Sequence, residues 1–347
     1  MLIVPAPPDP GWAKSQAPTL AQARALCDAG AEQVDLVIAG GRREQHLLGP
    51  VRVHLEPLLP GPLPRLGLVA RAVQLRPHLV HFYHWLDLRT LGMLAATPLV
   101  IHAEYNGGGV PLGPRSHLSR GVSRRLSALW VTARDQAEAF VRGGALSRST
   151  RIETAPETSS VLPVLPRRPG PGPRVLVVAR AAPDKRPEVA LRAFERIRAV
   201  HPAATLTWAA LSAGPRHSWL AESVRAAGGE LWLGIGSEQM AERYSSADLL
   251  LHPSAREVCG YAFIEGMQAG LRIAASDIPP FRALAGADGA ALAPVGDDQA
   301  LAEGALRLWA DPEAGLRARR RYEYALSFEA IGRRKLAGYR GERLSDY

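Results

Sequence analysis

Cysteine, lysine and long apolar runs are scarce in this sequence. Its 347 residues include two cysteines, Cys27 and Cys259. Two thiols exclude a framework of several disulfides and fit a reducing compartment. No stretch approaches the roughly 18 consecutive apolar residues that a membrane-spanning helix needs, and the apolar start, residues 1–5, is too short and uncharged for a signal peptide. We therefore expect a cytoplasmic protein, with peripheral contact at the inner membrane surface as the remaining membrane option.

Positive charge comes almost entirely from arginine. The chain has 39 arginines and only 3 lysines, and its net charge is +9. A GC-rich genome that favours arginine codons explains this bias, and attraction to anionic partners such as nucleotide diphosphates or lipid headgroups is the alternative. No zinc-ligand spacing, recognition-helix pattern or aromatic RNA-binding motif accompanies the charge. We therefore expect no nucleic-acid partner.

Short apolar runs alternate with amphipathic ones along both halves of the chain. The pattern predicts strands over 2–4, 33–39, 51–54, 78–82, 98–102, 129–132, 151–154, 174–179, 205–210, 231–233, 248–251, 273–275 and 290–293. It predicts helices over 19–29, 65–75, 86–95, 117–128, 133–142, 187–200, 237–246, 261–268 and 298–310, with one or two more between 313 and 340. Strands that alternate with helices of this length indicate parallel βαβ units in doubly wound α/β sheets.

A proline-rich stretch divides the two halves. Residues 161–173 contain five prolines and two glycines and cannot sustain a helix or a central strand. We predict an N-terminal Rossmann-like domain over 1–160, a linker over 161–173, a second Rossmann-like domain over 174–325 and a helical segment over 326–347. Such domains bind ligands at the carboxyl ends of their strands, so a cleft between them is the expected site.

The run from His252 to Gly270 carries the densest chemistry. An apolar strand precedes it, Gly260 lies where a helix begins, and two carboxylates, Glu257 and Glu265, are separated by seven residues. Free N–H groups and the helix dipole make such a helix start an anion site. Glu265, predicted about two turns into the helix, can accept hydrogen bonds from vicinal hydroxyls. A phosphate site with a carboxylate on each side fits a nucleotide sugar.

Two cations follow the first strand of the second domain. Arg180 and Lys185 lie five positions apart in the loop after it. A bidentate guanidinium and a mobile ammonium suit two phosphates and the charge that develops as a nucleotide leaves. The sequence has no Asp-x-Asp, so we expect no metal site and no cofactor beyond a nucleoside diphosphate sugar as co-substrate.

In these motifs the chain resembles the retaining glycosyltransferases of family 4, most strongly over 174–312 and more weakly over 78–158. The resemblance rests on the Glu pair, on Arg180 with Lys185, on Tyr-Ser-Ser-Ala-Asp at 244–248 and on Ser-Asp-Ile-Pro at 276–279. It implies a GT-B fold, with two Rossmann-like domains facing a cleft and C-terminal helices packing back toward the first. It implies sugar transfer with retained configuration. It assigns ribose to Glu265 and the donor sugar to Glu257, and the predicted donor site also includes Cys259, Gly260 and Tyr261.

Candidates in the first domain are fewer. His102, predicted at the carboxyl end of a strand, is a catalytic candidate because the family often has a histidine here, near sugar or acceptor. A buried structural histidine is the alternative. His81 and His84, at another predicted strand end, are acceptor candidates together with Lys14, which lies where the family usually has a Gly-Gly loop. The acceptor itself is unidentified and could be a glycan, a lipid-linked sugar or a small molecule.

One further segment and two other functions stay open. Residues 115–126 are basic with apolar positions between, which fits either a helix resting on an anionic membrane or an ordinary surface helix. The predicted function is a glycosyltransferase of class EC 2.4, hexosyl or related. The alternatives are a GT-B nucleotide-sugar epimerase and a catalytically silent relative that binds the nucleotide sugar.

Overall fold

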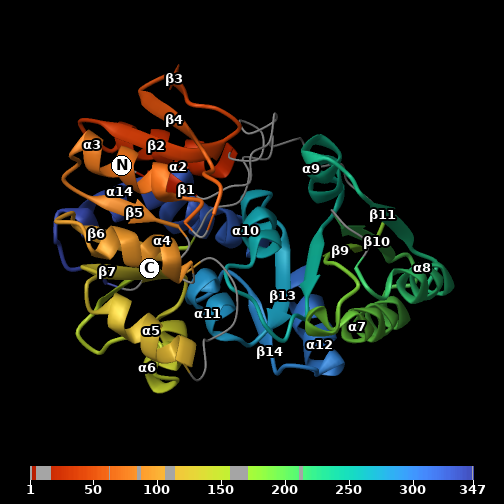
Figure 1. Ribbon diagram of the computed structural model, residues 1–347. Coiled ribbons are helices and arrows are strands. Elements are labelled where there is room, and N and C mark those ends of the chain that lie inside the picture. Colours follow the sequence, from red (N-terminus) through yellow and green to blue (C-terminus); the bar gives the residue numbers. More distant parts are fainter. Residues whose placement is uncertain are drawn as a thin grey trace. The chain divides into compact units, whose positions relative to one another are not determined.

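The computed structural model describes residues 2–4, 17–61, 63–83, 87–105, 114–156, 171–210, 214–345 and 347. The chain forms two compact units: unit 1 comprises residues 1–158 and 328–347, and unit 2 comprises residues 159–327. Both are α/β with doubly wound sheets (Figure 1), as predicted. The last helix belongs to unit 1, so the chain returns to its first unit at the end. Most of the predicted linker, 161–170, lies outside the described residues.

Unit 1 contains an eight-stranded sheet in the order β3-β4-β2-β1-β5-β6-β7-β8. Only the β3–β4 pair is antiparallel. The strands are β1 (Leu2–Val4), β2 (Val34–Gly40), β3 (Glu44–Leu48), β4 (Val51–Pro57), β5 (Val80–Phe82), β6 (Ile101–Glu104), β7 (Ala128–Val131) and β8 (Arg151–Thr154). The helices are α2 (Ala17–Asp28), α3 (Leu66–Leu75), α4 (Leu88–Ala95), α5 (Pro114–Ser123), α6 (Arg134–Arg142) and α14 (Phe328–Tyr339).

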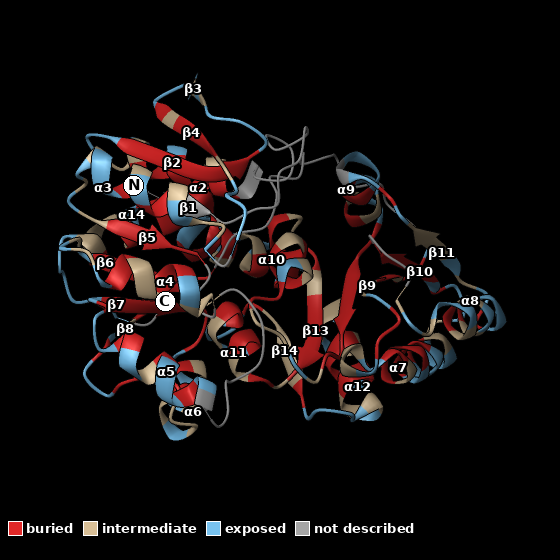
Figure 2. Cartoon of the chain, viewed as in Figure 1, coloured by how far each residue is buried: buried red, intermediate tan, exposed pale blue. Residues whose placement is uncertain are grey.

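Apolar cores form on both faces of this sheet. In β2, Val37 packs in the core that α3 and α4 cover, whereas its neighbour Leu36 packs in the core beneath α2 and α14. A strand covered on both faces needs a continuous apolar run, which explains the buried sequence of β2 (Figure 2). Helix α14 approaches α2 closely because Gly332 has no side chain; a Cβ there would lie 2.6 Å from the Ala25 carbonyl oxygen.

Unit 2 contains a six-stranded parallel sheet in the order β11-β10-β9-β12-β13-β14. The strands are β9 (Arg174–Val178), β10 (Thr205–Ala210), β11 (Glu230–Leu233), β12 (Leu249–His252), β13 (Arg272–Ser276) and β14 (Ala291–Ala293). In chain order this is the 3-2-1-4-5-6 arrangement of dinucleotide-binding folds. The order reverses between β9 and β12, so ligands are expected at the carboxyl ends of these two strands.

Helices cover both faces of the second sheet. They are α7 (Pro187–Val200), α8 (His217–Ala226), α9 (Ser237–Ser246), α10 (Tyr261–Gln268), α11 (Pro279–Ala285), α12 (Asp298–Ala310) and α13 (Ala314–Arg321), with a 3-10 turn, η1 (Pro183–Lys185), and a π-helical turn, η2 (Tyr322–Leu326). Pro187 starts α7, where its missing N–H costs nothing. Asp297 caps α12 by accepting from the Ala300 N–H. In the described part of the chain no helix is long and apolar enough to cross a membrane.

The structure corrects several sequence-based element boundaries. Strand β3 and helices α8 and α11 were not predicted, and α5 ends at Ser123 rather than at 128. Strand β6 starts at Ile101, which makes His102 its second residue rather than its carboxyl end. His81 is likewise the middle residue of β5 rather than its end. The two histidines are register partners in the β5–β6 ladder.

Candidate functional site

Two loops of unit 2 meet at the point where its strand order reverses. The loop after β9 spans 179–186 and contains η1, and the loop after β12 spans 253–260. The Ala255 N–H donates to the Asp184 carbonyl at 2.8 Å and joins the two loops through their backbones. The fold therefore brings Lys185 and Glu257, 72 positions apart, to one place. This confirms neither role, but it places both side chains where this sheet order binds ligands.

The Glu257 carboxylate contacts two nitrogen atoms in the site. Its Oε1 accepts from Lys185 Nζ at 2.5 Å and lies 3.0 Å from His252 Nε2. Burial alone would raise the pKa of this carboxyl, but the hydrogen bond from His252 and the Lys185 ammonium hold the pKa at about 2. Glu257 is therefore an anion near neutral pH. Sequence reasoning assigned no role to His252, whose only signal was its place at the end of an apolar strand.

The Arg180 side chain differs from that of Lys185 in having no hydrogen-bond or ion-pair partner among the described residues. Arg180 follows β9 by two positions, and its side chain is exposed. An unengaged guanidinium beside the neutralised Lys185–Glu257 pair leaves a net positive charge in these two loops. That charge favours an anionic ligand.

Glu265 points to a buried tyrosine. It is the fifth residue of α10, just over one turn from the start rather than two. Its Oε2 accepts from the Tyr244 hydroxyl of α9 at 2.7 Å. Burial raises the pKa of Tyr244 well above its ordinary value, and the Glu265 carboxylate raises it further. Tyr244 therefore stays a donor and orients Glu265, a role that its place in Tyr-Ser-Ser-Ala-Asp did not reveal.

Gly260 starts α10 in a conformation that other residues rarely adopt. Its φ is +79°, and a Cβ there would lie 2.7 Å from the Phe281 ring. The backbone can therefore turn sharply into α10 and present the first N–H groups of the helix. Cys259 beside it is buried, whereas Tyr261 is 44% exposed. The predicted donor-binding role of these three residues stays a prediction.

His102 lies in the interior of unit 1, where it is 2% exposed. Its Nδ1 accepts from the Trp130 indole N–H at 3.0 Å. Burial lowers the pKa of His102 to about 3, with smaller contributions from His81 and Arg151. The imidazole is therefore neutral with its proton on Nε2, so it can donate a hydrogen bond but cannot supply a proton as an imidazolium. Its catalytic role stays a prediction with that restriction.

His81 belongs to a buried polar network rather than to an exposed acceptor surface. Its Nε2 donates to Glu104 Oε2 at 2.8 Å, and its Nδ1 lies 2.7 Å from the Tyr339 hydroxyl of α14. Burial lowers the pKa of His81 to about 4 despite the hydrogen bond to Glu104. Glu104 also accepts from Lys335 Nζ at 2.8 Å. This contact fixes α14 on the sheet, and a role of His81 toward acceptor stays a prediction.

The remaining first-domain candidates are described only in part. Lys14 and His84 lie outside the described residues. Helix α5 exposes Arg115 and Leu118, the latter by 57%, so the basic segment does present an apolar side chain to solvent. Among the described residues no three His, Cys, Asp or Glu side chains gather as metal ligands would.

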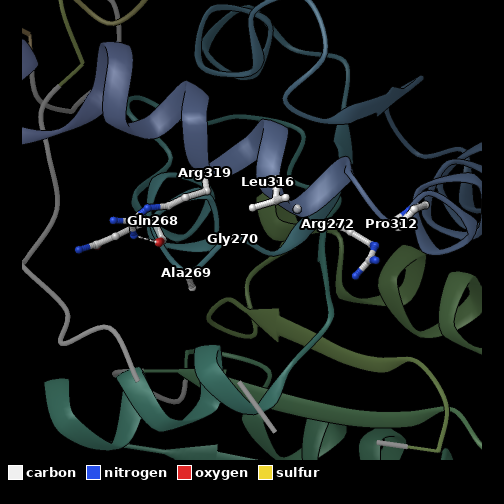
Figure 3. Close-up of a pocket in the computed structure, with 8 residues that line it drawn as sticks. Gln268, Ala269, Gly270, Arg272, Pro312, Leu316 and Arg319 are labelled. Atoms are coloured by element: carbon white, nitrogen blue, oxygen red, sulfur yellow. Dashed lines mark hydrogen bonds between the residues drawn. The ribbon is translucent and has the colours of Figure 1, made fainter. Parts of the chain in front are cut away.

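A pocket of about 340 Å³ lies at the other end of α10. Figure 3 shows residues that line it, among them Gln268, Gly270, Arg272, Leu316 and Arg319. Arg319 is already engaged, because its guanidinium donates to the Gln268 carbonyl and to Glu323. Helix carboxyl ends carry partial negative charge and disfavour phosphate. The phosphate site is therefore expected at the Gly260 end of α10 and not in this pocket.

A protein-family model matches most of unit 2. Residues 172–311 match the model of glycosyl transferases group 1. The matched stretch contains Arg180, Lys185, Glu257 and Glu265, which are the residues whose geometry is described above. No curated protein matches the sequence.

Solved structures resemble the chain over nearly its whole length. Sucrose-phosphate synthase from Thermosynechococcus elongatus aligns with a TM-score of 0.72 and 20% identity over 98% of each chain. A glycosyltransferase from Rickettsia africae gives 0.72 and 12% identity over 98% of this chain and 97% of that one. Anabaena HepE, solved in complex with UDP and glucose, gives 0.63 and 14% identity over 99% of both chains. These likenesses confirm the predicted GT-B fold.

Proposed function

We propose that the protein transfers a sugar from a nucleoside diphosphate sugar to an acceptor, with retention of the anomeric configuration. The family match over residues 172–311 supports sugar transfer. The observation that carries the proposal is the meeting of Lys185 and Glu257 where the order of the unit 2 strands reverses. The matched family model describes glycosyl transferases, and none of the reported structures is described as an epimerase. No observation favours the epimerase alternative.

Each side chain of the unit 2 site has a distinct role in this proposal. Arg180 and Lys185 bind the diphosphate, because one is unengaged and the other carries a mobile ammonium. Glu265, oriented by Tyr244, accepts hydrogen bonds from the ribose hydroxyls. Glu257 lies beside the donor sugar as a carboxylate. The charge distribution then matches a ligand with phosphate between two groups of hydroxyls.

The reaction makes its largest electrostatic demand at the departing diphosphate. The bond from the anomeric carbon to the phosphate oxygen breaks, and the acceptor oxygen bonds to the same carbon on the same face of the sugar. The acceptor proton leaves with the diphosphate, so the products are the glycoside and the nucleoside diphosphate. Arg180 and Lys185 stabilise the charge that forms on the leaving oxygen. Glu257 stabilises positive charge that develops on the sugar ring.

On the acceptor side, we propose roles for His102 and for helix α5. His102 contributes the Nε2–H donor near sugar or acceptor, consistent with its neutral state. Helix α5, with Arg115 and the exposed Leu118, is the surface on which we place peripheral contact with an anionic membrane. We also propose that the enzyme is cytoplasmic and needs no metal. Because HepE was solved with UDP and glucose, UDP-glucose is the first donor to test.

A panel of UDP, GDP, ADP and dTDP sugars tests donor binding through thermal stability. A donor at about 100 times its Kd stabilises the folded state by about 2.7 kcal/mol, which corresponds to a rise in Tm of roughly 5 to 10 °C for a unit of this size. Lys185→Met removes the ammonium and abolishes most of the rise, whereas Arg320→Met, on the exposed face of α13, leaves it. No response to any nucleotide sugar would overturn the proposed function.

Turnover separates transfer from other uses of the same site. Release of the nucleoside diphosphate that depends on added acceptor indicates transfer, and Lys185→Met slows it by about 100- to 1,000-fold, the usual loss for one preorganised donor to developing charge. Interconversion of the donor without release would indicate isomerisation. Binding without either reaction would indicate a silent relative.

A further inference from the structure

The carboxylate of Glu257 shares one oxygen between two partners. Lys185 Nζ and His252 Nε2 both contact Oε1, at 2.5 and 3.0 Å. All three side chains are largely buried, with 16% of Lys185, 4% of His252 and 14% of Glu257 exposed. A largely buried anion that loses its partners is costly. When a ligand binds, the position of the Glu257 carboxylate therefore depends on which of its two partners still contacts it.

The two partners differ in how firmly they are held. His252 is the last residue of β12, and its backbone pairs with Ala275 of β13. Its ring packs edge-on against Phe281, with centroids 4.7 Å apart. Lys185 instead reaches Glu257 from the end of a short 3-10 turn, on a four-carbon stem. The ammonium can turn to another anion while the imidazole keeps its place.

The hydrogen-bond role of the ring nitrogen that contacts Glu257 follows from that neighbour. Because Glu257 is an anion, Nε2 of His252 must donate to it. The Nδ1 of the same ring is buried without a hydrogen-bond partner among the described residues, and so is Ser254 Oγ two positions later. An unpaired buried polar atom costs about 1 to 3 kcal/mol. The His252 ring is buried despite this cost in stability, which is consistent with a functional role for Nε2, the nitrogen that contacts Glu257.

We propose that His252 is the positioning residue that keeps Glu257 in place when Lys185 turns to the diphosphate of the donor. This inference rests on the proposed function. In the free protein Lys185 neutralises Glu257, and the diphosphate then competes for the same ammonium. His252 retains Oε1 throughout the exchange. The backbone bond from Ala255 to Asp184 keeps the two loops together while the ion pair opens.

A pair of amide variants tests the positioning role. The amide nitrogen of His252→Gln reaches the position of Nε2 and still donates to Glu257, whereas that of His252→Asn reaches only the position of Nδ1. Both lose the packing of the ring against Phe281, so each is the other's control for stability. His217→Asn, at an exposed position in α8, controls for histidine removal in general.

The expected result is a separation of turnover from binding. His252→Asn lowers kcat by up to about 100-fold, as misplacement of a catalytic group by about 1 Å does, with the Kd for the nucleoside diphosphate within about 3-fold of wild type. His252→Gln restores most of kcat at a similar Tm. Equal kcat in His252→Asn and wild type would overturn the inference, and so would equal losses of kcat in both amide variants.

A donor-independent measurement separates this inference from the proposed function. In protein labelled with 15N histidine, Lys185→Met leaves His252 as the remaining partner of the Glu257 carboxylate among the described residues. In the wild type, inorganic diphosphate draws the ammonium away. Both changes shift the Nε2 resonance of His252 in the same direction. A resonance unmoved by Lys185→Met would overturn the inference even if the enzyme were active. A wild type that uses no donor while this shift occurs would overturn the proposed function alone.

Discussion

Removing the buried ammonium of Lys335 is expected to release α14 from unit 1. Lys335 is 1% exposed, and its Nζ contacts Glu104 Oε2 at 2.8 Å and Gln22 Oε1 at 3.1 Å. At that separation the charge pair attracts by about 6 kcal/mol for an effective dielectric of about 20. Burial alone would raise the pKa of Glu104, but Lys335 and the hydrogen bond from His81 hold that pKa at about 2. Lys335→Met leaves this carboxylate buried and uncompensated.

Proton uptake limits the cost of that substitution. If the proton goes to Glu104, its cost at pH 7 is about 4 kcal/mol, since each unit between the ordinary pKa near 4.3 and the pH costs 1.36 kcal/mol. If the proton goes to His81, the same relation with the ordinary pKa of 6.5 gives a minimum of about 0.7 kcal/mol, because burial lowers the pKa of this ring. The lost hydrogen bond to Gln22 adds about 1 kcal/mol. We expect a net loss of about 2 to 5 kcal/mol at pH 7 that shrinks toward pH 5.

Hydrogen exchange of the α14 amides measures this loss, because it reports opening of one segment rather than of the whole chain. Rates are compared at pH 7 and pH 5 after correction for intrinsic exchange. Lys335→Met/Glu104→Gln removes both charges and recovers most of the protection, and Arg333→Met, on the exposed face of α14, is the matched control. A loss under about 1 kcal/mol at pH 7, or one that does not shrink on acidification, would refute the reasoning.

Three further outcomes follow from contacts within single units. Tyr244→Phe removes the hydrogen bond that orients the predicted ribose carboxylate, so calorimetry should find the nucleoside diphosphate bound about 5-fold more weakly, as for about 1 kcal/mol; unchanged affinity would contradict this role. Burial lowers the pKa of His81 and His102 from 6.5 to about 4 and 3, so the unfolded state binds more protons and stability falls from pH 6.5 toward pH 4; a Tm constant from pH 7 to 4.5 would contradict it. Gly260→Ala forces φ +79° on alanine and a Cβ against Phe281, so both Tm and donor binding should drop, and an unchanged pair of values would show that α10 tolerates the strain.

Sequence periodicity located four helices of unit 2 accurately, although it missed α8 and α11. The predicted helices over 187–200, 237–246, 261–268 and 298–310 have the observed bounds. Their starts carry local signals that need no tertiary information, such as Pro187 at the first position of α7 and the Asp297 cap of α12. The Glu257–Glu265 spacing is local in the same way, because both carboxylates belong to one loop and the helix that follows it.

Strand ends and edge strands were less predictable. The apolar run from Leu99 suggested a strand that ends at His102, but the sheet ladder begins only at Ile101, so the histidine moved from an end to the interior. Strand β3 alternates half-buried and exposed residues at a sheet edge, which gives it a weak apolar signal. Periodicity reports which residues face a core but not where pairing with a neighbour starts.

Contacts between distant residues were beyond any local pattern. Lys335 and Glu104 are 231 positions apart, and Lys185 and Glu257 are 72 apart. Tyr244 of α9 meets Glu265 of α10 only because the fold brings these two side chains together. Each of these pairs sets the charge or orientation of a predicted residue, so the sequence could name candidate site residues but not the partners that hold them.

The scarcity of lysine acquires a physical meaning from these contacts. Two of the three lysines lie in ion pairs with buried carboxylates, in a chain that otherwise uses 39 arginines. At Lys335 a closed core offers an oxygen from Glu104 and one from Gln22, which a compact ammonium can satisfy and the five donors of a guanidinium cannot. At Lys185 a bidentate arginine would hold Glu257 more firmly and oppose the exchange with a diphosphate, whereas a point charge on a flexible stem can change partners. The chemistry of single sites therefore explains why these two positions carry lysine in an arginine-rich chain.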